Sequence, residues 1–128
     1  MKNDTASHLA DGFNPDRCPV EATLAVIGGR WKPLILYHLR ERPRRFNELR
    51  RLMPRVTQRM LTQHLRELEA DGVVIRHVRE QVPPHVEYSF SVKGRTLLPL
   101  LDAMADWGCA NGDGTSSSAV CRRDPTSQ

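Results

Sequence analysis

The sequence contains no long apolar run, few cysteines and no motif that is typical of an enzyme. None of its apolar stretches approaches the roughly 20 residues that a membrane-spanning helix needs. The opening residues 1–12 are polar, which argues against a signal peptide. We therefore expect a cytoplasmic protein that has no membrane partner. Its 128 residues leave room for one compact domain of the usual size of about 100 to 150 residues.

Three cysteines, Cys18, Cys109 and Cys121, lack both the spacing of a metal site and that of a disulfide framework. Because the cytosol keeps isolated thiols reduced, all three are predicted to be free. The five histidines are scattered without ligand spacing, so no metal site is expected. The chain also lacks a GxGxxG motif, a phosphate loop and a Cys-x-x-Cys pair. The sequence therefore predicts no cofactor and no enzymatic activity, including that of a thiol-dependent redox enzyme.

Positive charge is concentrated in one segment. Residues 40–66 contain nine arginines and two glutamates, a net charge of +7, whereas the whole chain carries +4. The rest of the chain therefore sums to a charge of −3. A basic segment on an otherwise slightly acidic molecule is typical of a surface that binds nucleic-acid phosphates.

Residues 17–109 are predicted to form the folded domain. A flexible tail at 1–16 and a disordered tail at 110–128 are expected, because both ends are polar and have few large apolar residues. Within the domain, apolar residues recur at helical spacing in three early segments. The predicted helices are Val20–Ile27, Trp31–Leu39 and Asn47–Met53, the last with Asn47 as its N-cap.

The fourth predicted helix, Thr57–Asp71, has the clearest local signals. Thr57 is a good N-cap, and Val56 is placed to pack on Leu61. Gly72 supplies the left-handed backbone conformation that ends a helix. The predicted inner stripe consists of Met60, Leu61, Leu65 and Leu68. The opposite face carries five hydrogen-bonding side chains, those of Gln58, Arg59, Thr62, Gln63 and Arg66.

After Gly72 the apolar period changes from about 3.6 to 2, which predicts a β-hairpin. Its strands cover Val74–Arg79 and Val86–Phe90, and its tip holds Val82–His85. A last helix, Lys93–Gly108, presents more apolar surface than a small core requires, which favours a partner subunit. The apolar residues of this helix are Leu97, Leu98, Leu101, Met104 and Trp107.

The order helix, helix, helix-turn-helix, hairpin, helix predicts the fold class. We expect an α+β fold, mostly α, in which a winged helix-turn-helix carries a β-hairpin wing and the terminal helices form a dimer interface. In this arrangement the second helix of the helix-turn-helix enters the major groove of duplex DNA. The hairpin then leans over the neighbouring minor groove.

Several short motifs follow one another in a specific order. They are Cys18-Pro19, Gly28-Gly29-Arg30-Trp31-Lys32, Arg45-Phe46-Asn47-Glu48-Leu49, Leu61-Thr62, Leu65-Arg66-Glu67-Leu68, Asp71-Gly72 and Pro83-Pro84-His85-Val86-Glu87-Tyr88. With these motifs the chain resembles, over about 18–108, the HxlR-type family of bacterial transcriptional regulators in the MarR-like superfamily. The resemblance implies a homodimer that binds a palindromic operator, as a repressor or an activator. Two positions depart from the family pattern: His85 stands where relatives often have Arg or Lys, and Ser91-Val92-Lys93 replaces a more usual Thr-Glu at the start of the last helix.

The predicted DNA-binding residues fall into three groups. Base readers are expected on the fourth helix, because Arg pairs with guanine and Gln with adenine; they are Gln58, Arg59, Thr62 and Gln63. Phosphate contacts, which set register without reading sequence, are expected from Arg45, Arg50, Arg51 and Arg55. The wing supplies Arg79 and His85, and Thr57 and Arg66 complete the set. The alternatives are a solvated helix face and a wing in which Arg79 pairs with Glu80 or Glu87.

Some members of the HxlR-type family sense oxidants or electrophiles, such as quinones and aldehydes, through a cysteine at the motif position of Cys18. The resemblance therefore implies a redox-sensing role for Cys18, with a small electrophile or oxidant as effector. The neighbouring Arg17 would favour the reactive thiolate electrostatically. The alternative is that Cys18 serves packing alone. Cys109 is a candidate partner across subunits, and Cys121 is expected to lie in the tail without a role.

Together these features predict a sequence-specific transcriptional regulator that binds double-stranded DNA. The alternative from another class is a winged-helix protein-interaction module, whose basic face holds an acidic partner and does not bind DNA. Salt-dependent affinity for duplex DNA distinguishes the two.

Overall fold

The computed structural model describes residues 18–112 and residue 121, which fall into two compact units divided between Arg95 and Thr96. The predicted tail at 1–16 and most of the predicted tail beyond 112 lie outside the described residues. The first unit contains α2 (Pro19–Ile27), α3 (Lys32–Leu39), β1 (Arg44–Arg45), α4 (Phe46–Leu52), α5 (Gln58–Ala70), β2 (Val74–Arg79), β3 (His85–Phe90) and α6 (Val92–Arg95). The second contains α7 (Leu98–Asn111).

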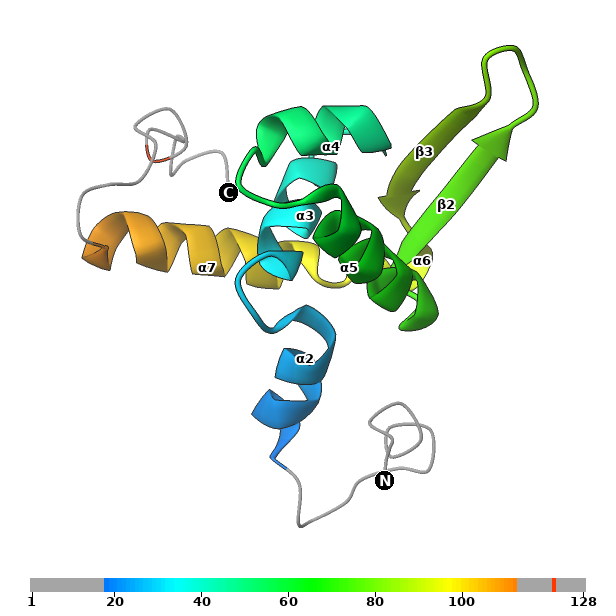
Figure 1. The fold of residues 1–128 in the computed structure, drawn as a ribbon. Helices are drawn as coiled ribbons and strands as arrows, with labels where there is room; N and C mark the ends of the chain where they lie inside the picture. Colours follow the sequence, from blue (N-terminus) through cyan, green and yellow to red (C-terminus); the bar gives the residue numbers. More distant parts are fainter. Residues whose placement is uncertain (1–17, 113–120, 122–128) are drawn as a thin grey trace. The chain divides into compact units, whose positions relative to one another are not determined.

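The first unit has the winged helix-turn-helix arrangement predicted from the sequence (Figure 1). Helix α5 packs against α3 and against the start of the hairpin, while β2 and β3 extend beyond the helices as a wing. The fully buried side chains come from α3, α4, α5 and the residue before β2, so these elements share one core. These side chains are Ile35, Leu36, Leu49, Leu61, Leu65, Leu68 and Val73.

Helix α5 begins and ends where its local signals place it. Thr57 is the N-cap, since its Oγ1 accepts a hydrogen bond from the backbone N–H of Met60 at 3.1 Å. Gly72 follows the helix with a φ of 80°, a conformation that favours glycine. Leu61, Leu65 and Leu68 are buried as predicted.

The prediction that Met60 belongs to the inner stripe of α5 is wrong, because 38% of this residue is exposed. Met60 precedes Leu61 by one residue and is therefore rotated by about 100° away from the stripe that Leu61 begins. Its side chain lies at the margin of the buried face.

The N-cap of α4 also differs from the prediction. The helix begins at Phe46 and is capped at Arg45, so Asn47 lies inside the first turn. The Glu48 side chain reaches back and accepts a hydrogen bond from the backbone N–H of Arg45 at 2.9 Å. The side-chain hydrogen bond at the start of α4 thus comes from Glu48, the third residue of the helix, and not from Asn47 as an N-cap.

The wing is part of a three-stranded antiparallel sheet with the order β1-β3-β2. The hairpin has the predicted strands, except that β3 begins at His85, which was expected in the tip. Val74 lies opposite Phe90 and Arg79 opposite His85. The short strand β1 was not predicted. It pairs Arg44 with Tyr88 and thereby joins the segment before α4 to the wing.

The predicted last helix, Lys93–Gly108, is two helices. Helix α6 ends at Arg95, and α7 starts at Leu98. Pro99 explains the new start, because proline lacks the N–H that a continuing helix needs and is tolerated in the first turn. Within the first unit, Gly94 of α6 packs so closely on the carbonyl oxygen of Val73 that a Cβ would collide with it.

Helix α7 combines buried and exposed apolar residues. Leu101 is buried, whereas Leu100, Met104 and Trp107 are exposed, Trp107 by 69%. These three exposed residues recur at helical spacing and form one apolar face. Among the residues that the structure describes, no helix is both long enough and apolar enough to span a bilayer.

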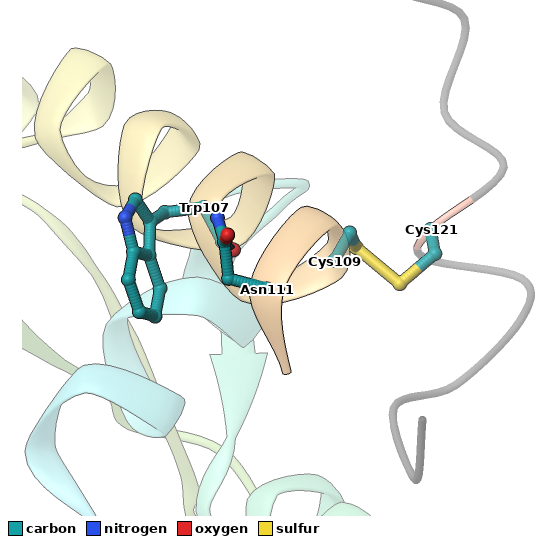
Figure 2. Close-up of a disulfide and its surroundings, with 4 residues drawn as sticks. All are labelled: Trp107, Cys109, Asn111 and Cys121. Carbon is teal, nitrogen blue, oxygen red and sulfur yellow. Dashed lines mark hydrogen bonds between the residues drawn. A yellow bond between two sulfur atoms is a disulfide. The ribbon is translucent and has the colours of Figure 1, made fainter. Parts of the chain in front are cut away.

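A disulfide in the second unit corrects the prediction that all three cysteines are free. Cys109, in the last turn of α7, is bonded to Cys121 of the same chain (Figure 2). Their Cα atoms are 5.4 Å apart, a usual distance for this bond. The prediction failed because the two residues are separated by 12 positions and form no recognisable framework. Cys121 therefore has a partner, and the partner of Cys109 lies in its own chain.

Candidate nucleic-acid interface

The outer face of α5 is accessible along its length. Gln58, Arg59, Gln63 and Arg66 are exposed and Thr62 is half-buried, while the leucines of the same helix fill the core. The polar face therefore does not pack into the interior, which is the first requirement for contact with a DNA groove.

Several side chains of this face are held by neighbours in the protein. The Arg50 guanidinium of α4 donates to Gln58 Oε1 at 3.4 Å, which links the two helices of the helix-turn-helix. The Thr62 hydroxyl donates to the backbone oxygen of Gln58 at 2.8 Å. By contrast, Arg59 and Arg66 make no hydrogen bond or ion pair with any residue in the described part of the chain. These two cations are available to a ligand.

Glu67 fixes the orientation of Gln63. The Gln63 Nε2 atom donates to Glu67 Oε2 at 2.8 Å, and Lys32 Nζ of α3 lies 2.7 Å from Glu67 Oε1. The hydrogen bonds from Lys32 and then Gln63 lower the pKa of Glu67, so it is a carboxylate at neutral pH. Because a carboxylate only accepts, the Gln63 amide nitrogen must face it. The Gln63 oxygen and its second N–H are left for another partner.

Helix α4, which precedes α5, and the loop between these two helices supply further exposed cations. Arg50, Arg51 and Arg55 are exposed, as is Arg45 at the cap of α4. In the described residues, Arg51 and Arg55 have no carboxylate partner. Exposed arginines beside a recognition helix are the groups expected to bind phosphates.

Arg42 and Arg44, from the same basic segment, are instead paired within the protein. Arg42 Nη2 donates to Glu48 Oε2 at 2.5 Å, and Arg44 Nη2 donates to Glu41 Oε1 at 3.0 Å. The hydrogen bond from Arg42, followed by that from the Arg45 backbone, lowers the pKa of Glu48 to about 2. These pairs anchor β1 and the start of α4, so part of the basic segment serves the fold.

His38 carries no positive charge to this surface at neutral pH. Burial, and then the nearby Arg44 guanidinium, lower the pKa of His38 below its ordinary value of 6.5. Its backbone oxygen accepts a hydrogen bond from Arg44 Nε at 3.0 Å. His38 is therefore neutral, and its backbone oxygen helps to hold the Arg44 side chain in place.

Glu87 lies between the two predicted contact residues of the wing. Arg79 Nη2 is 3.8 Å from Glu87 Oε1, and His85 Nε2 is 3.3 Å from Glu87 Oε2. The Arg79 side chain is 63% exposed, but that of His85 only 11%. Arg79 is thus the more accessible cation of the wing, and Glu87 rather than Glu80 is the carboxylate near it.

The residues that follow α5 are hydrogen-bonded to the residues after the wing. Ser91 Oγ donates to the backbone oxygen of Gly72 at 2.6 Å, and Lys93 Nζ donates to that of Asp71 at 2.9 Å. Sequence reasoning missed these positioning residues, together with Lys32, Glu48 and Glu67, and named Glu87 only as an alternative partner of Arg79. Only Glu48 had a local signal, since an acidic residue three positions after an N-cap is typical of a capping box.

Cys18 is exposed and is the N-cap of α2. Its sulfur has no disulfide partner within the part of the chain that the structure describes. The side chain makes no capping hydrogen bond either. An exposed thiol at the positive end of a helix is open to reaction, so the geometry does not bury Cys18 in the core.

Comparisons with known proteins agree with this geometry. Residues 26–116 match the model of the HxlR-like helix-turn-helix family. The HTH-type transcriptional regulator YybR of Bacillus subtilis, itself uncharacterised, is 57% identical over 100 residues, which are 78% of this chain and 80% of YybR.

Two redox-related structures have the same fold. The redox regulator HypR in its oxidised form aligns with a TM-score of 0.73 and 58% identity, over 75% of this chain and 99% of HypR. The reduced form of the regulator YodB from B. subtilis aligns with a TM-score of 0.66 and 32% identity, over 78% of this chain and 99% of YodB. These relatives are regulators rather than enzymes. The chain thus belongs to the HxlR-like helix-turn-helix family and is an HTH-type transcriptional regulator.

Proposed function

We propose that the protein acts in the cytoplasm as a homodimeric repressor that binds a palindromic operator sequence-specifically. The observation that carries this proposal is the outer face of α5, where Arg59 and Arg66 are exposed and unpaired in the described residues while Gln63 is held in one orientation. Helix α5 enters the major groove, and the β2–β3 wing lies along the neighbouring minor groove.

The exposed residues divide into base readers and phosphate binders. Arg59 reads guanine and Gln63 reads adenine, each through two hydrogen bonds, and Gln58 and Thr62 contact adjacent base edges. Arg66 and Thr57 lie at the two ends of this face. The phosphate binders are Arg45, Arg50, Arg51 and Arg55. On the wing, exposed Arg79 contacts DNA most directly, and His85 contributes beside it.

Two exposed apolar surfaces support a homodimer. On α7 they are Leu100, Met104 and Trp107, and on α2 they are Val20 and Leu24. Exposed apolar faces of this kind are typical of subunit interfaces. A two-fold dimer presents two recognition helices to two half-sites, so the symmetry of the protein predicts a palindromic operator.

The direct test is duplex binding at several salt concentrations, with an operator selected from genomic fragments and a scrambled duplex of the same composition. Arg59→Ala is expected to weaken operator binding about 10-fold or more while changing scrambled binding little, because one bidentate pair contributes about 1–3 kcal/mol of discrimination. Arg51→Ala is expected to weaken both duplexes equally and to reduce the salt slope by about 1.

Arg42→Ala is the matched control for Arg51→Ala, because it removes the same charge from an arginine that Glu48 already neutralises. It is expected to leave the salt slope unchanged. Equal loss on both duplexes for Arg59→Ala would refute its role in base reading. A wild-type protein without salt-dependent affinity for any duplex would instead support the protein-interaction module.

We also propose that Cys18 makes the regulator responsive to oxidants or electrophiles. The support is its exposure and its place at the start of α2, together with the redox regulator HypR, which was solved in oxidised and reduced forms. Oxidant treatment is expected to change operator affinity in the wild type and not in Cys18→Ser. Unchanged affinity in the treated wild type rejects this response.

A further inference from the structure

We propose that Cys109 and Cys121 are a reversible redox site of this chain, which exchanges with small organic disulfides and works without Cys18. The proposal rests on the proposed function only in that DNA binding places the protein in the cytosol. A disulfide there is usually transient and redox-sensing, because the thiol pool of the cell reduces bonds that serve as mere scaffolds.

The pair has the geometry for bond formation within one chain. The Cα atoms of Cys109 and Cys121 are 5.4 Å apart, and the cysteines are bonded in the structure. Cys109 lies in an ordered helical turn, where Asn111 Nδ2 donates to the Trp107 oxygen at 3.1 Å and the Gly112 N–H donates to the Gly108 oxygen at 2.8 Å. The Cys109 sulfur is thus held in place on α7, where the Cys121 sulfur can bond to it.

The disulfide lies away from the apolar face of α7. Two helical positions separate Cys109 from Trp107, a rotation of about 200° around the helix axis. In Figure 2 the Trp107 ring and the Cys109 sulfur accordingly leave the helix in different directions. The face formed by Leu100, Met104 and Trp107 therefore stays available for a second copy in both redox states.

Accessibility assigns the order of the two chemical steps. Cys109 is exposed and Cys121 is half-buried. The Cys109 thiolate attacks one sulfur of a disulfide RSSR, which forms a mixed disulfide and releases one RS⁻. The Cys121 thiolate then attacks the Cys109 sulfur, closes the protein disulfide and releases the second RS⁻. Two protein thiols are oxidised, and RSSR is reduced to two RSH after each RS⁻ takes up a proton.

Of the two cysteines, only Cys109 lies inside the region that matches the family model. The match ends at residue 116, so Cys121 lies beyond it. Cys18 is the third cysteine and is free in the structure, while the other two are bonded to each other. The chain thus combines a single thiol at α2 with a dithiol at α7.

The test uses the full chain in buffers that range from excess reduced to excess oxidised glutathione. Free thiols are then blocked with N-ethylmaleimide and counted by intact mass. Cys18→Ser, which leaves the pair intact, is expected to pass from two blocked thiols to none as the oxidised form increases, and to run as a monomer on a non-reducing gel. Cys18→Ser/Cys121→Ser is expected to accumulate one glutathione on Cys109, because the second step is lost.

Three results would overturn the proposal. The pair could stay closed in excess reduced glutathione, which would make it a fixed cross-link, or stay open in excess oxidised glutathione. Cross-linked dimers of Cys18→Ser would show that the sulfurs join two chains instead. Thiol counting does not depend on DNA, so a protein that shows the expected transition but binds no duplex would contradict the proposed function alone.

Discussion

The two halves of the arginine-rich segment differ in what surrounds their positive charges. In residues 41–48, Arg42 contacts Glu48 and Arg44 contacts Glu41, and these contacts hold β1 and the start of α4 in place. Within residues 50–66, Arg51, Arg55, Arg59 and Arg66 have no carboxylate partner in the described part of the chain. The net charge of the segment therefore includes arginines with a carboxylate partner and arginines without one. Only those without a carboxylate partner are free to bind phosphates or bases.

The placement of carboxylates decides which polar side chains are free. Glu48 holds Arg42, Glu67 holds Gln63, and Glu87 lies beside Arg79. Removal of each carboxylate should have a different consequence: loss of stability, loss of base preference, or a small gain of affinity. Substitution of each of these three carboxylates therefore tests the difference between paired and unpaired side chains separately.

The largest effect is expected for Glu48→Ala. The variant loses the ion pair with Arg42 and the hydrogen bond from the Arg45 backbone at 2.9 Å. Loss of a helix cap and a charged hydrogen bond costs about 2 kcal/mol of unfolding free energy. Urea unfolding measures this loss. Glu69→Ala is the matched control, because this exposed glutamate makes no side-chain hydrogen bond or ion pair among the described residues, and an equal loss there would contradict a special role for Glu48.

The pH dependence of stability gives a second readout for the same residue. The pKa of Glu48 is lowered from 4.5 to about 2 in the folded protein, so its carboxylate stabilises the fold above about pH 4.5. This contribution is lost as the pH falls from about 4.5 towards 2. The wild type should lose more stability over this range than Glu48→Ala, and parallel curves for the two proteins would exclude this cause.

An intermediate effect is expected for Glu67→Ala, which releases Gln63. The free amide can then rotate, so the preference for adenine at the base pair that Gln63 contacts should fall roughly 3- to 5-fold. This loss is part of the discrimination that one bidentate pair provides. Loss of a negative charge raises affinity for every duplex, so the quantity to measure is the ratio of affinities for duplexes that differ only at that base pair.

A double-mutant cycle shows whether Glu67 acts through Gln63. In a Gln63→Ala background, Glu67→Ala should leave the ratio unchanged, because no amide remains to be oriented. Lys32 contacts Glu67 at 2.7 Å, so thermal unfolding of each variant should be measured as well. If Glu67→Ala lowered the ratio equally in both backgrounds, its effect would not depend on Gln63.

The sequence predicts elements whose signals are local. Helix α5 has its cap at Thr57 and its glycine at Gly72, and the wing has a clear two-residue period, so both were located within one residue at each end. Strand β1 has only two residues and exists because β3 lies beside it, which no local pattern reveals. The break between α6 and α7 has a local cause in Pro99, but the continuous apolar spacing conceals it.

The network that orients the candidate interface could not be predicted, because its members are distant in sequence. Lys32 and Glu67 belong to two separate motifs, and only the packing of α3 on α5 brings them together. The Cys109–Cys121 bond likewise joins two residues that are 12 positions apart in the sequence. Periodicity identifies which face of a helix is exposed, but not which exposed side chains already have a partner.

The smallest effect is expected for Glu87→Gln on the wing. The substitution removes the carboxylate near Arg79 and His85, so Arg79 becomes free to approach phosphates. Affinity for operator and scrambled duplexes should rise about 2- to 3-fold, and the salt slope should increase by up to about 0.9, the value for one further phosphate contact. Glu80→Gln is the matched control, because it makes the same charge change at an exposed residue of the same hairpin. If both variants raised affinity equally, the general field of the wing would account for the gain, and Glu87 would not restrain Arg79.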